Sequence, residues 1–474
     1  MGIFMKPGHD SFDVAIVGGG PVGMLMAAEL SLQGLEVVLF EPRRSVDNRP
    51  RAGTIHVRSL SHLVRRGYIP STNPHLLRKR SQQKNVAGFQ LAGGIQLLLS
   101  APATEPFPIA GIPQAALESA FERRARQQGA EVLRGTRVTE LHVDRNSVTV
   151  VFEQGNSTQL TINASYVVGA DGARSFVARH GDFPTVESPP TMQAMSALAH
   201  TNDPLIPPGW NQTQGGWTMH NPGFEAPGRV IGMDFSGPIQ DRTSPTEAEY
   251  RDLIKRVLGR APELSDISHI TRFSDFSRYR LTMRSERLIL VGDAAHIHYP
   301  LGGQGLNTGI QDAFTLSWRL ALVVKEKLPE KVLDEWSRAR VKVAAKVVAN
   351  TLVQSRLMDP KNRSLRESFA ELMELPDFHE AMSKLISGQF QDDFVNDLLI
   401  RPSDPSLTET SLSRELAEGR VVELRATPDV VSNDRPSLEK KVITGSFYPP
   451  LESDVVLIQP DGYAVPQADY ALFQ

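Results

Sequence analysis

Short apolar runs, a glycine-rich turn and a helical pattern follow one another near the start of the chain. Phe12–Val17 has the composition of a short buried strand and leads directly into the turn, after which Val22–Gln33 has the pattern of a helix. Gly34 is typical of a helix end, and Glu36–Phe40 predicts a second strand. This order of elements predicts a βαβ unit with two parallel strands.

Two later segments show the same strand–turn–helix pattern. Tyr166–Gly169 predicts a buried strand, and a turn that contains Asp171 leads to a helix start near Ser175. Leu288–Val291 predicts another buried strand, followed by a glycine-rich entrance to a long helix that is expected to run to about Val324. The chain therefore has three places where a strand leads through glycine towards a helix.

The stretches between these units, Gly67–Gly111 and Asp182–Arg287, lack the alternation of strands and helices. They contain strand-like runs at Phe89–Leu99, Ala194–His200, Trp217–His220 and Arg229–Phe235. These runs predict a single further sheet outside the βαβ pattern.

The last third of the chain changes character twice. Helical patterns cover Pro329–Arg356, Leu365–Leu375 and His379–Ile386. From about residue 394 onwards prolines separate short polar segments, and Val455–Gln459 with the following Asp461–Gly462 predicts a late strand and turn. We therefore expect a helical segment over 329–393 and a small C-terminal domain over 394–474.

Composition narrows the classes of function. A chain of 474 residues is long enough for roughly three domains. Its 51 Lys and Arg residues and 54 Asp and Glu residues give a net charge of −3, which does not favour binding to nucleic acid or anionic lipid. The sequence has neither a signal-peptide pattern nor an apolar run long enough for a membrane span, so a cytoplasmic protein is expected. The absence of cysteine excludes disulfides, thiolate metal sites and a flavin tethered through sulfur.

The first turn contains the clearest candidate chemistry. Gly18, Gly20 and Gly23 have the GxGxxG spacing, in which glycines make the turn, admit a pyrophosphate against the backbone and allow helix and strand to pack closely. Glu41 ends the second strand, where a carboxylate can accept hydrogen bonds from ribose hydroxyls. Together these residues predict a dinucleotide site.

A second contact with the cofactor is expected after the third strand. Asp293 is placed to reach a ribityl hydroxyl, and residues 300–309 offer free backbone N–H groups at a helix start. His296 and His298 could share a face of an extended segment, but the sequence places no third ligand beside them, so no metal site is predicted.

In their order and spacing these motifs resemble the flavoprotein aromatic hydroxylases, the single-component FAD monooxygenases with the para-hydroxybenzoate hydroxylase fold. The motifs concerned are the GxGxxG turn, Gly169–Gly172, Gly292–His296 and Pro300–Asn307. Two further segments resemble the corresponding parts of the phenolic polyketide hydroxylases and rifampicin monooxygenases, two branches of this family. They are Arg51–Ser59 and Ile112–Gln114. The resemblance covers about residues 12 to 350.

The resemblance implies an α/β fold with a discontinuous Rossmann-like FAD-binding domain formed by residues 10–66, 112–181 and 288–328. A β-sheet substrate domain would comprise 67–111 and 182–287, with the helical segment as a brace for the flavin domain. Val456–Gly462 is similar to the late strand and turn of the thioredoxin-like domain found in the polyketide branch, which here would be truncated.

The resemblance also implies residue roles. The expected contacts to non-covalent FAD are Gly18, Gly20, Gly23, Glu41, Arg43, Arg51, Gln114, Asp171, Asp293, Pro300, Gly305, Leu306 and Asn307. The catalytic segment beside the isoalloxazine ring would include Pro300, Gly303, Gln304 and Gly305, whose N–H groups would stabilise negative charge on the reduced flavin.

The implied reaction uses NADPH or NADH as a transient co-substrate, because no second GxGxxG follows a strand. Reduced flavin and O₂ would form a C4a-(hydro)peroxide that hydroxylates a phenolic polycyclic or polyketide-like molecule. Baeyer–Villiger oxidation, N- or enol-oxygenation and a flavin-binding module without oxygenase activity remain open, as do the choice of nicotinamide, the substrate and the oligomeric state.

Candidate residues for the substrate cavity are Phe89, Trp217, Met219, His220 and Phe235, which fall in the strand-like runs. A base for a phenol could be His220, His200 or Tyr279, although each is more simply a structural residue. Tyr299 and Leu301 stand where relatives of this branch often have smaller residues, which predicts a bulkier wall beside the ring.

Overall fold

The computed structural model describes most of the chain up to residue 389 and short parts of the remainder. The described residues are 10–49, 51–69, 86–101, 107–155, 158–222, 227–238, 243–389, 401–402, 415–416, 418–425, 440–444, 447–448 and 455–461.

The largest sheet has eight strands, and its central part is parallel. The parallel strands lie in the order β19, β10, β1, β2, β7, and antiparallel strands extend the sheet at β18 and at β9 and β8. Their bounds are β1 Ser11–Val17, β2 Val37–Glu41, β7 Glu131–Arg134, β8 Thr136–Val143, β9 Val148–Gln154, β10 Thr158–Gly169, β18 Arg284–Ser285 and β19 Leu288–Leu290. The three strands predicted to lead into glycine turns, β1, β10 and β19, are therefore neighbours.

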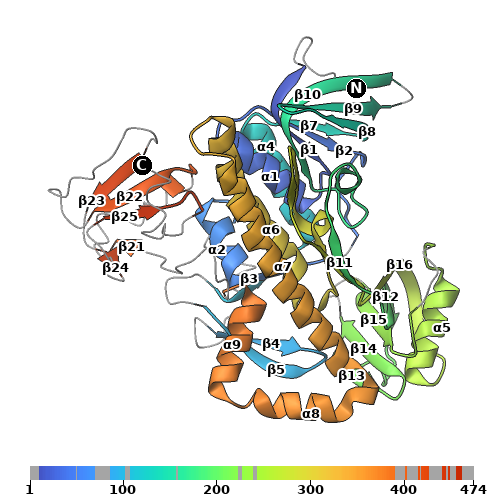
Figure 1. Ribbon diagram of the computed structural model, residues 1–474. Helices are drawn as coiled ribbons and strands as arrows, with labels where there is room; N and C mark the ends of the chain where they lie inside the picture. The colour runs from blue at the N-terminus through green and yellow to red at the C-terminus, as the bar shows by residue number, and fades with distance from the viewer. Residues whose placement is uncertain are drawn as a thin grey trace.

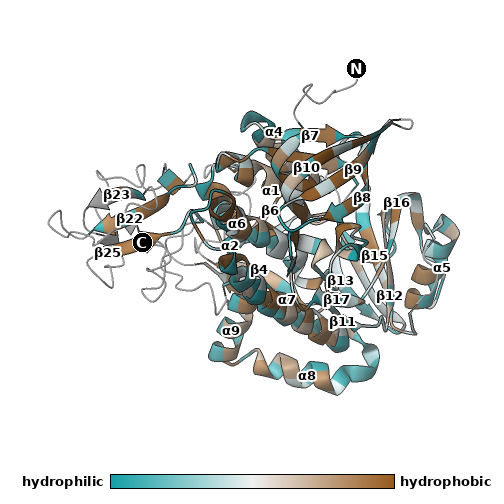
Figure 2. Cartoon of the chain, turned by 45° about the horizontal axis from the view of Figure 1, so that its top comes forward, coloured by the Kyte–Doolittle hydropathy of each residue, from teal (hydrophilic) through white to brown (hydrophobic). Residues whose placement is uncertain are grey.

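Helix α1, Pro21–Leu32, lies in the middle of this half of the molecule. It packs against α4, Gln114–Gln127, and against α6, Gln304–Val324, while its axis runs along the sheet. Because it is covered on several sides, nine of its residues, including Glu29, are buried. The central parallel strands β1, β2 and β19 are almost entirely apolar and buried, as burial on both faces requires, and they contribute to the brown interior of the large sheet in Figure 2.

A second, antiparallel sheet has the order β13, β14, β15, β12, β16. Its strands are β12 Gln193–Thr201, β13 Gly209–Thr213, β14 Gly216–Asn221, β15 Gly228–Asp234 and β16 Leu264–Ser274. One face is covered by α5, Glu247–Leu258, which begins with a capping box formed by Thr246 and Glu249.

The prediction that Phe89–Leu99 joins this sheet is wrong. Strands β4, Val86–Leu91, and β5, Ile95–Ser100, form a separate hairpin. The backbone N–H of Leu98 on β5 donates to Nε2 of His379 at 2.8 Å instead of to another strand. The backbone of β5 is therefore bonded to a side chain of helix α9, Pro376–Ser387, which packs against it.

Two small sheets connect the halves of the molecule. One joins β11, Thr185–Ser188, and β17, Ser277–Arg280, to β20, His296–Ile297. The other pairs β3, Thr54–His56, with β6, Ile109–Gly111, just before helix α2, Val57–Arg65. Short 3-10 turns complete this region at η1 Val177–Arg179, η2 Gly292–Ala294 and η3 Leu301–Gly303.

The helical segment consists of α7, Lys331–Met358, the turn η4 at Pro360–Asn362, α8, Arg363–Leu372, and α9. Figure 1 shows α7 running beside α6 and continuing through α8 back to the β4–β5 hairpin. Trp336 and Arg340 on α7 are completely buried against the core.

The described strands near the C-terminus are β21 Arg401–Pro402, β22 Val421–Arg425, β23 Lys440–Thr444, β24 Phe447–Tyr448 and β25 Val455–Ile458. The late strand predicted at Val455–Gln459 corresponds to β25, whereas Gly462 lies outside the described residues. Arg66 donates to the backbone oxygen of Pro460, and Trp318 donates to Asp461, so this part is docked on α2 and α6. None of the helices in the described part of the chain combines the length and apolar character that a bilayer span requires.

Candidate active site

A cavity of about 840 Å³ opens at the carboxyl ends of the parallel strands. Val17 of β1, Phe40 of β2 and Val291 after β19 form its floor, and the first turns of α1 and α6 border it. The carboxyl ends of parallel strands are where open α/β sheets bind ligands, because the loops there are free to shape a site. We call this cavity the cleft.

The turn before α1 has the geometry that a bound pyrophosphate needs. Gly18 has a φ of +105°, and a Cβ there would lie 2.5 Å from the carbonyl oxygen of Ala170. Gly20 is open to the cleft, with no atom within 4 Å of a Cβ position, and it begins a helix that has no side-chain cap. The free N–H groups of this helix start can therefore bind an anion. Gly23 is not part of the cleft lining. It packs closely against the turn instead, because a Cβ there would lie only 1.9 Å from the carbonyl oxygen of Gly18.

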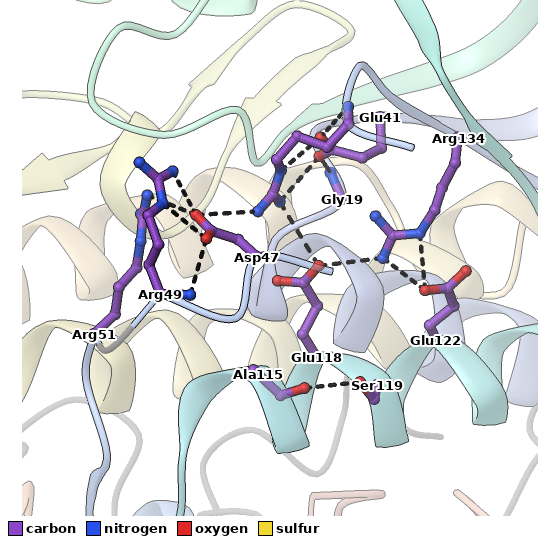
Figure 3. A network of polar contacts seen from close by, with 11 residues as sticks. Gly19, Glu41, Asp47, Arg49, Arg51, Ala115, Glu118, Ser119, Glu122 and Arg134 are labelled. Atoms are coloured by element: carbon purple, nitrogen blue, oxygen red, sulfur yellow. Dashed lines mark hydrogen bonds and ion pairs between the residues drawn. The ribbon is translucent and has the colours of Figure 1, made fainter. Parts of the chain in front are cut away.

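Glu41 is held by a network at the edge of the cleft (Figure 3). Its Oε2 accepts from the backbone N–H of Gly19 at 2.7 Å, and its Oε1 accepts from the backbone and Nε of Arg43, both at 2.8 Å. Burial raises the pKa of Glu41, but these hydrogen bonds and the charge of Arg43 outweigh it, so the pKa is lowered. The carboxylate is ionised and retains lone pairs for a ribose hydroxyl.

Arg51 lies at the mouth of the cleft, where its Nη2 is 3.0 Å from Asp47. Asp47 also binds Arg49 at 2.6 Å, and these arginines hold the pKa of Asp47 well below its usual range. About half of the Arg51 side chain is exposed, so its guanidinium remains accessible to a phosphate from the cleft.

Asp171 and Asp293 reach the cleft from two different strands. Asp171 Oδ2 accepts from the backbone N–H groups of Phe176 and Val177, so it caps the turn η1, while its buried Oδ1 has no partner among the described residues. Desolvation in the cleft raises the pKa of both carboxyls, because it disfavours the charged form. For Asp293 this rise is opposed by His296 and, less strongly, by Arg51.

The segment that leads into α6, which we call the ring loop, covers residues 298–305 and includes the first two residues of the helix. Gly302 and Gly303 have φ values of +77° and +64°, which favour glycine, and they turn the chain into α6 without a side-chain cap. His56 Nε2 lies 2.7 Å from the carbonyl oxygen of Gly302 and must donate to it, because a carbonyl oxygen only accepts. The start of α6 therefore presents free N–H groups beside a fixed turn.

A buried ion cluster supports this arrangement from behind. Asp312 Oδ1 accepts from Nε of Arg340 at 2.7 Å, while its Oδ2 accepts from Nε2 of His296 at 2.8 Å and from the backbone of Gly292 at 3.0 Å. Burial raises the pKa of Asp312, but Arg340 and His296 outweigh it and lower the pKa to about 2. The cluster fixes the backbone of Gly292, the residue directly before Asp293.

His298 lies in the wall of the cleft, whereas His296 points to Asp312. Nδ1 of His298 is 2.9 Å from the carbonyl oxygen of Tyr299, so Nδ1 carries the proton and Nε2 is an acceptor. Burial lowers the pKa of His298 to about 4, so the ring is neutral near pH 7. Among the described residues no group of three or more acidic or histidine side chains is placed to hold a metal ion.

Most of the predicted cofactor residues meet at this one cleft. Its lining includes Gly18, Gly20, Glu41, Arg43, Arg51, Gln114, Asp171, Asp293, Pro300, Gly303, Gly305 and Leu306. Asn307 instead fastens α6 to β3, since its Oδ1 accepts from the backbone of His56 and its Nδ2 donates to the oxygen of Thr54. The side chain of Gln304 is also buried away from the cleft and accepts from Asn350 on α7 at 2.6 Å.

Four of the five residues predicted for the substrate cavity lie in one apolar cluster behind the ring loop. Trp217, Phe235, Phe89 and Met219 pack with Tyr299, Leu301 and residues of the β4–β5 hairpin, α7 and α9. We call this group the apolar cluster.

The prediction that His220 shares this cavity is not supported. Alternate residues of a strand point to opposite faces, and His220 is paired with Val230, which belongs to the core beneath α5. Of the two other candidate bases, His200 is exposed, and Tyr279 packs against the main core.

Several lining residues were not predicted. They include Asp47 and Arg49, Thr136–Thr139 of β8, Arg174, Phe176, Arg179 and His298. One of these residues had a usable signal in the sequence, because Arg174 lies two positions after the Gly169–Gly172 motif. For β8 there was none, since its approach to the cleft depends on the antiparallel extension of the sheet.

The cleft fits FAD on its own geometry. It has two uncapped helix starts for negative charge, an open glycine for the pyrophosphate, and carboxylates at two strand ends for hydroxyl groups. Its lining includes Glu41 and Arg43 at the end of β2 as well as Pro300 and Gly305 around the start of α6.

Comparison with known proteins agrees with this geometry. The profile of the FAD binding domain family matches residues 11–351. The chain belongs to this family. Rifampicin monooxygenase from Streptomyces venezuelae is 32% identical over 96% of this chain and 95% of its own. Among solved structures, anhydrotetracycline hydroxylase from Streptomyces rimosus matches with a TM-score of 0.82 and 28% identity, covering 96% of this chain and 95% of that chain.

These relatives confirm the mixed α/β fold, the use of FAD and the resemblance to aromatic hydroxylases. The chain is an FAD-dependent monooxygenase, a type of enzyme that uses NAD(P)H and O₂. A relative with a different kind of name, dialkyldecalin synthase from Streptomyces rugosporus, is 29% identical over 95% of this chain and 94% of its own.

Proposed function

We propose that this monooxygenase hydroxylates a phenolic polycyclic or polyketide-like small molecule. The observation that supports this most directly is the position of the ring loop between two compartments. His298, Pro300 and Gly303 face the polar cleft, whereas Tyr299 and Leu301 belong to the apolar cluster. A flat aromatic molecule in the cluster would thus lie directly across the loop from the cofactor's reactive end.

Bound FAD would supply electron transfer from NAD(P)H and the activation of O₂. We infer that the chain's own contribution is positioning and electrostatics. Gly18, Gly20, Glu41 and Arg51 would bind the adenosine diphosphate half, and Asp293 the ribityl chain. The N–H groups at the start of α6, including Gly305, would stabilise negative charge at the ring. Gln304 would act through its backbone, because its side chain faces Asn350.

The apolar cluster has the composition expected for a site that excludes water from the reaction. Four buried methionines, Met192, Met233, Met358 and Met373, line it together with Trp217, and methionine adapts readily to ligand shape. The names of the relatives, rifampicin monooxygenase and anhydrotetracycline hydroxylase, support a polycyclic aromatic substrate of natural-product type.

The domain division expected from the sequence is part of this proposal. FAD would be held by 10–66, 112–181 and 288–328, and substrate by 67–111 and 182–287 with the helical segment closing the far side. The need for reduced nicotinamide favours action in the cytoplasm.

Oxidation of NADPH and NADH under air, with rifampicin, anhydrotetracycline and simple phenols, tests the proposal. We expect a yellow protein whose NAD(P)H consumption accelerates with a polycyclic phenol and yields a product heavier by one oxygen atom. A product with the same added mass in which a ring ketone has been expanded to a lactone would indicate Baeyer–Villiger oxidation instead.

The second candidate is a cyclase or binding function without oxygenation, favoured by the likeness to dialkyldecalin synthase. It predicts bound FAD, no acceleration of NAD(P)H consumption by any aromatic compound, and a product of unchanged mass. That combination of results would overturn the proposed hydroxylation.

A further inference from the structure

The ring loop places three consecutive side chains in different surroundings. His298 and Pro300 line the cleft, while the side chain of Tyr299, which stands between them, belongs to the apolar cluster. Tyr299 is completely buried there, and its ring lies 6.2 Å from that of Phe273 on β16. It is therefore a polar group inserted from the ring loop into a compartment of aromatic and methionine side chains.

The hydroxyl of Tyr299 has a weak partner. It donates to the thioether sulfur of Met233 on β15 at 3.2 Å. Two other tyrosines donate to oxygen: the half-buried Tyr68 to the carboxylate of Glu29 at 2.8 Å, and the buried Tyr250 to the carbonyl of Val230 at 3.1 Å. Thioether sulfur is a poor acceptor, so an oxygen atom would be a better partner for Tyr299.

Met233 can give up this hydrogen bond easily. Its side chain is unbranched and can change rotamer, and it lies on the same face of the sheet as Trp217, its partner on β14. Burial raises the pKa of Tyr299, and the nearby charge of Asp275 adds to this, so the phenol stays protonated and remains a donor at physiological pH.

We propose that Tyr299 positions the aromatic substrate by donating a hydrogen bond from its hydroxyl group to an oxygen atom of the substrate. Met233 accepts this hydrogen bond only until the substrate binds. The assignment rests on the proposed function and adds the substrate feature that is recognised, a phenolic or quinone oxygen on a flat ring system. Because Tyr299 adjoins Pro300, this hydrogen bond would set which ring carbon faces the cofactor.

The test uses FAD-loaded protein without NADPH and two probes that differ by one oxygen, 1-naphthol and naphthalene. Binding is followed by the change in the flavin absorption spectrum and by tryptophan fluorescence. We expect wild type to bind 1-naphthol about tenfold more tightly than naphthalene. In Tyr299→Phe this preference should fall to about twofold or less, while naphthalene binding stays within about twofold of wild type.

Tyr250→Phe is the matched control, because it removes a buried hydroxyl beneath α5, on the other face of the second sheet. It should lower the melting temperature and keep the wild-type preference for 1-naphthol. Tyr299→Phe should melt close to wild type, since only a bond to sulfur is lost. Met233→Leu should bind 1-naphthol as tightly as wild type or more tightly, because the donor no longer has a competing acceptor.

Retention of the preference in Tyr299→Phe would overturn the assignment, as would a wild type that binds both probes equally or neither. The outcome is separable from that of the proposed function. If wild type shows accelerated NAD(P)H oxidation with a phenol and Tyr299→Phe has the same KM for it, Tyr299 alone is wrongly assigned. If the probe preference behaves as expected but no aromatic compound accelerates oxidation, the hydroxylation is wrong and the binding role of Tyr299 stands.

Discussion

Replacing Asp312 by Asn removes the charge at the centre of the buried cluster behind the ring loop and leaves its shape almost unchanged. Asp312 accepts from Arg340, His296 and the backbone of Gly292, and its carboxylate is completely buried. An asparagine has one acceptor oxygen for these donors, and its NH₂ group would face at least one of them. Arg340, also completely buried, would lose its counter-charge.

The expected cost follows from the burial of Arg340. Removing one partner of a buried ion pair typically destabilises a protein by about 3–5 kcal/mol, because the other charge is left uncompensated away from water. Arg340 keeps its hydrogen bond to the carbonyl of Thr308, at 3.2 Å. We therefore expect a loss near the lower end, about 3 kcal/mol, with a reduced FAD content because Gly292 directly precedes Asp293.

Urea unfolding of wild type and Asp312→Asn at pH 7, each with and without FAD, measures this loss. Asp334→Asn is the control, since Asp334 forms an exposed pair with Arg284 and should cost less than about 1 kcal/mol. Adding Arg340→Met to Asp312→Asn removes the buried positive charge that no longer faces the Asp312 carboxylate. The double variant should therefore recover part of the lost free energy of unfolding. A difference below about 1 kcal/mol between wild type and Asp312→Asn would refute the argument that the buried charge is essential.

Further predictions concern the cleft and its pH dependence. Gly18→Ala should reduce FAD content at least tenfold, because the new methyl group would collide with the oxygen of Ala170; full FAD occupancy in dialysed protein would contradict this. Asp293→Ala should weaken FAD binding, seen as faster loss of flavin on gel filtration, while far-UV circular dichroism stays unchanged. The pKa of His56 and of His298 is lowered by burial to about 4, so unfolded chains bind more protons than folded ones between about pH 6.5 and 4. The free energy of unfolding should thus be highest above pH 6.5 and should fall, as the pH is lowered to about 4, by up to about 1.4 kcal/mol per pH unit for each histidine. His56→Gln should reduce the slope of this decrease with pH, measured by urea unfolding at several pH values. An unchanged slope would show that His56 does not contribute to it.

The local pattern of the chain predicted the strands and turns around the cofactor correctly. Phe12–Val17, Tyr166–Gly169 and Leu288–Val291 became the strands β1, β10 and β19 or their ends, because fully buried parallel strands require continuous apolar runs. Gly18, Gly302 and Gly303 have positive φ values, which other residues rarely adopt, so these glycines marked the turns in the sequence. These features are visible in sequence because each depends on a few neighbouring residues.

The placement of side chains across long distances was harder to predict. His220 was grouped with Trp217 and Met219 because all three lie in one strand-like run, although the alternation of side chains already puts His220 on the opposite face. Which face meets the ring loop and which packs beneath α5 is decided only by the tertiary structure. The β4–β5 hairpin also looked like part of the same sheet, but its strands pair only with each other within the described part of the chain, and β5 is bonded to α9.

By itself the sequence determined that this chain binds a dinucleotide at a glycine turn and resembles FAD-dependent aromatic hydroxylases. The tertiary structure decided which residues meet. It turned Gln304 and Asn307 away from the cleft, brought Arg340 of α7 onto Asp312, and directed Tyr299 into the apolar cluster. The physical reason is that backbone turns depend on local sterics, whereas the partner of a buried polar side chain is selected by whichever element the fold packs against it.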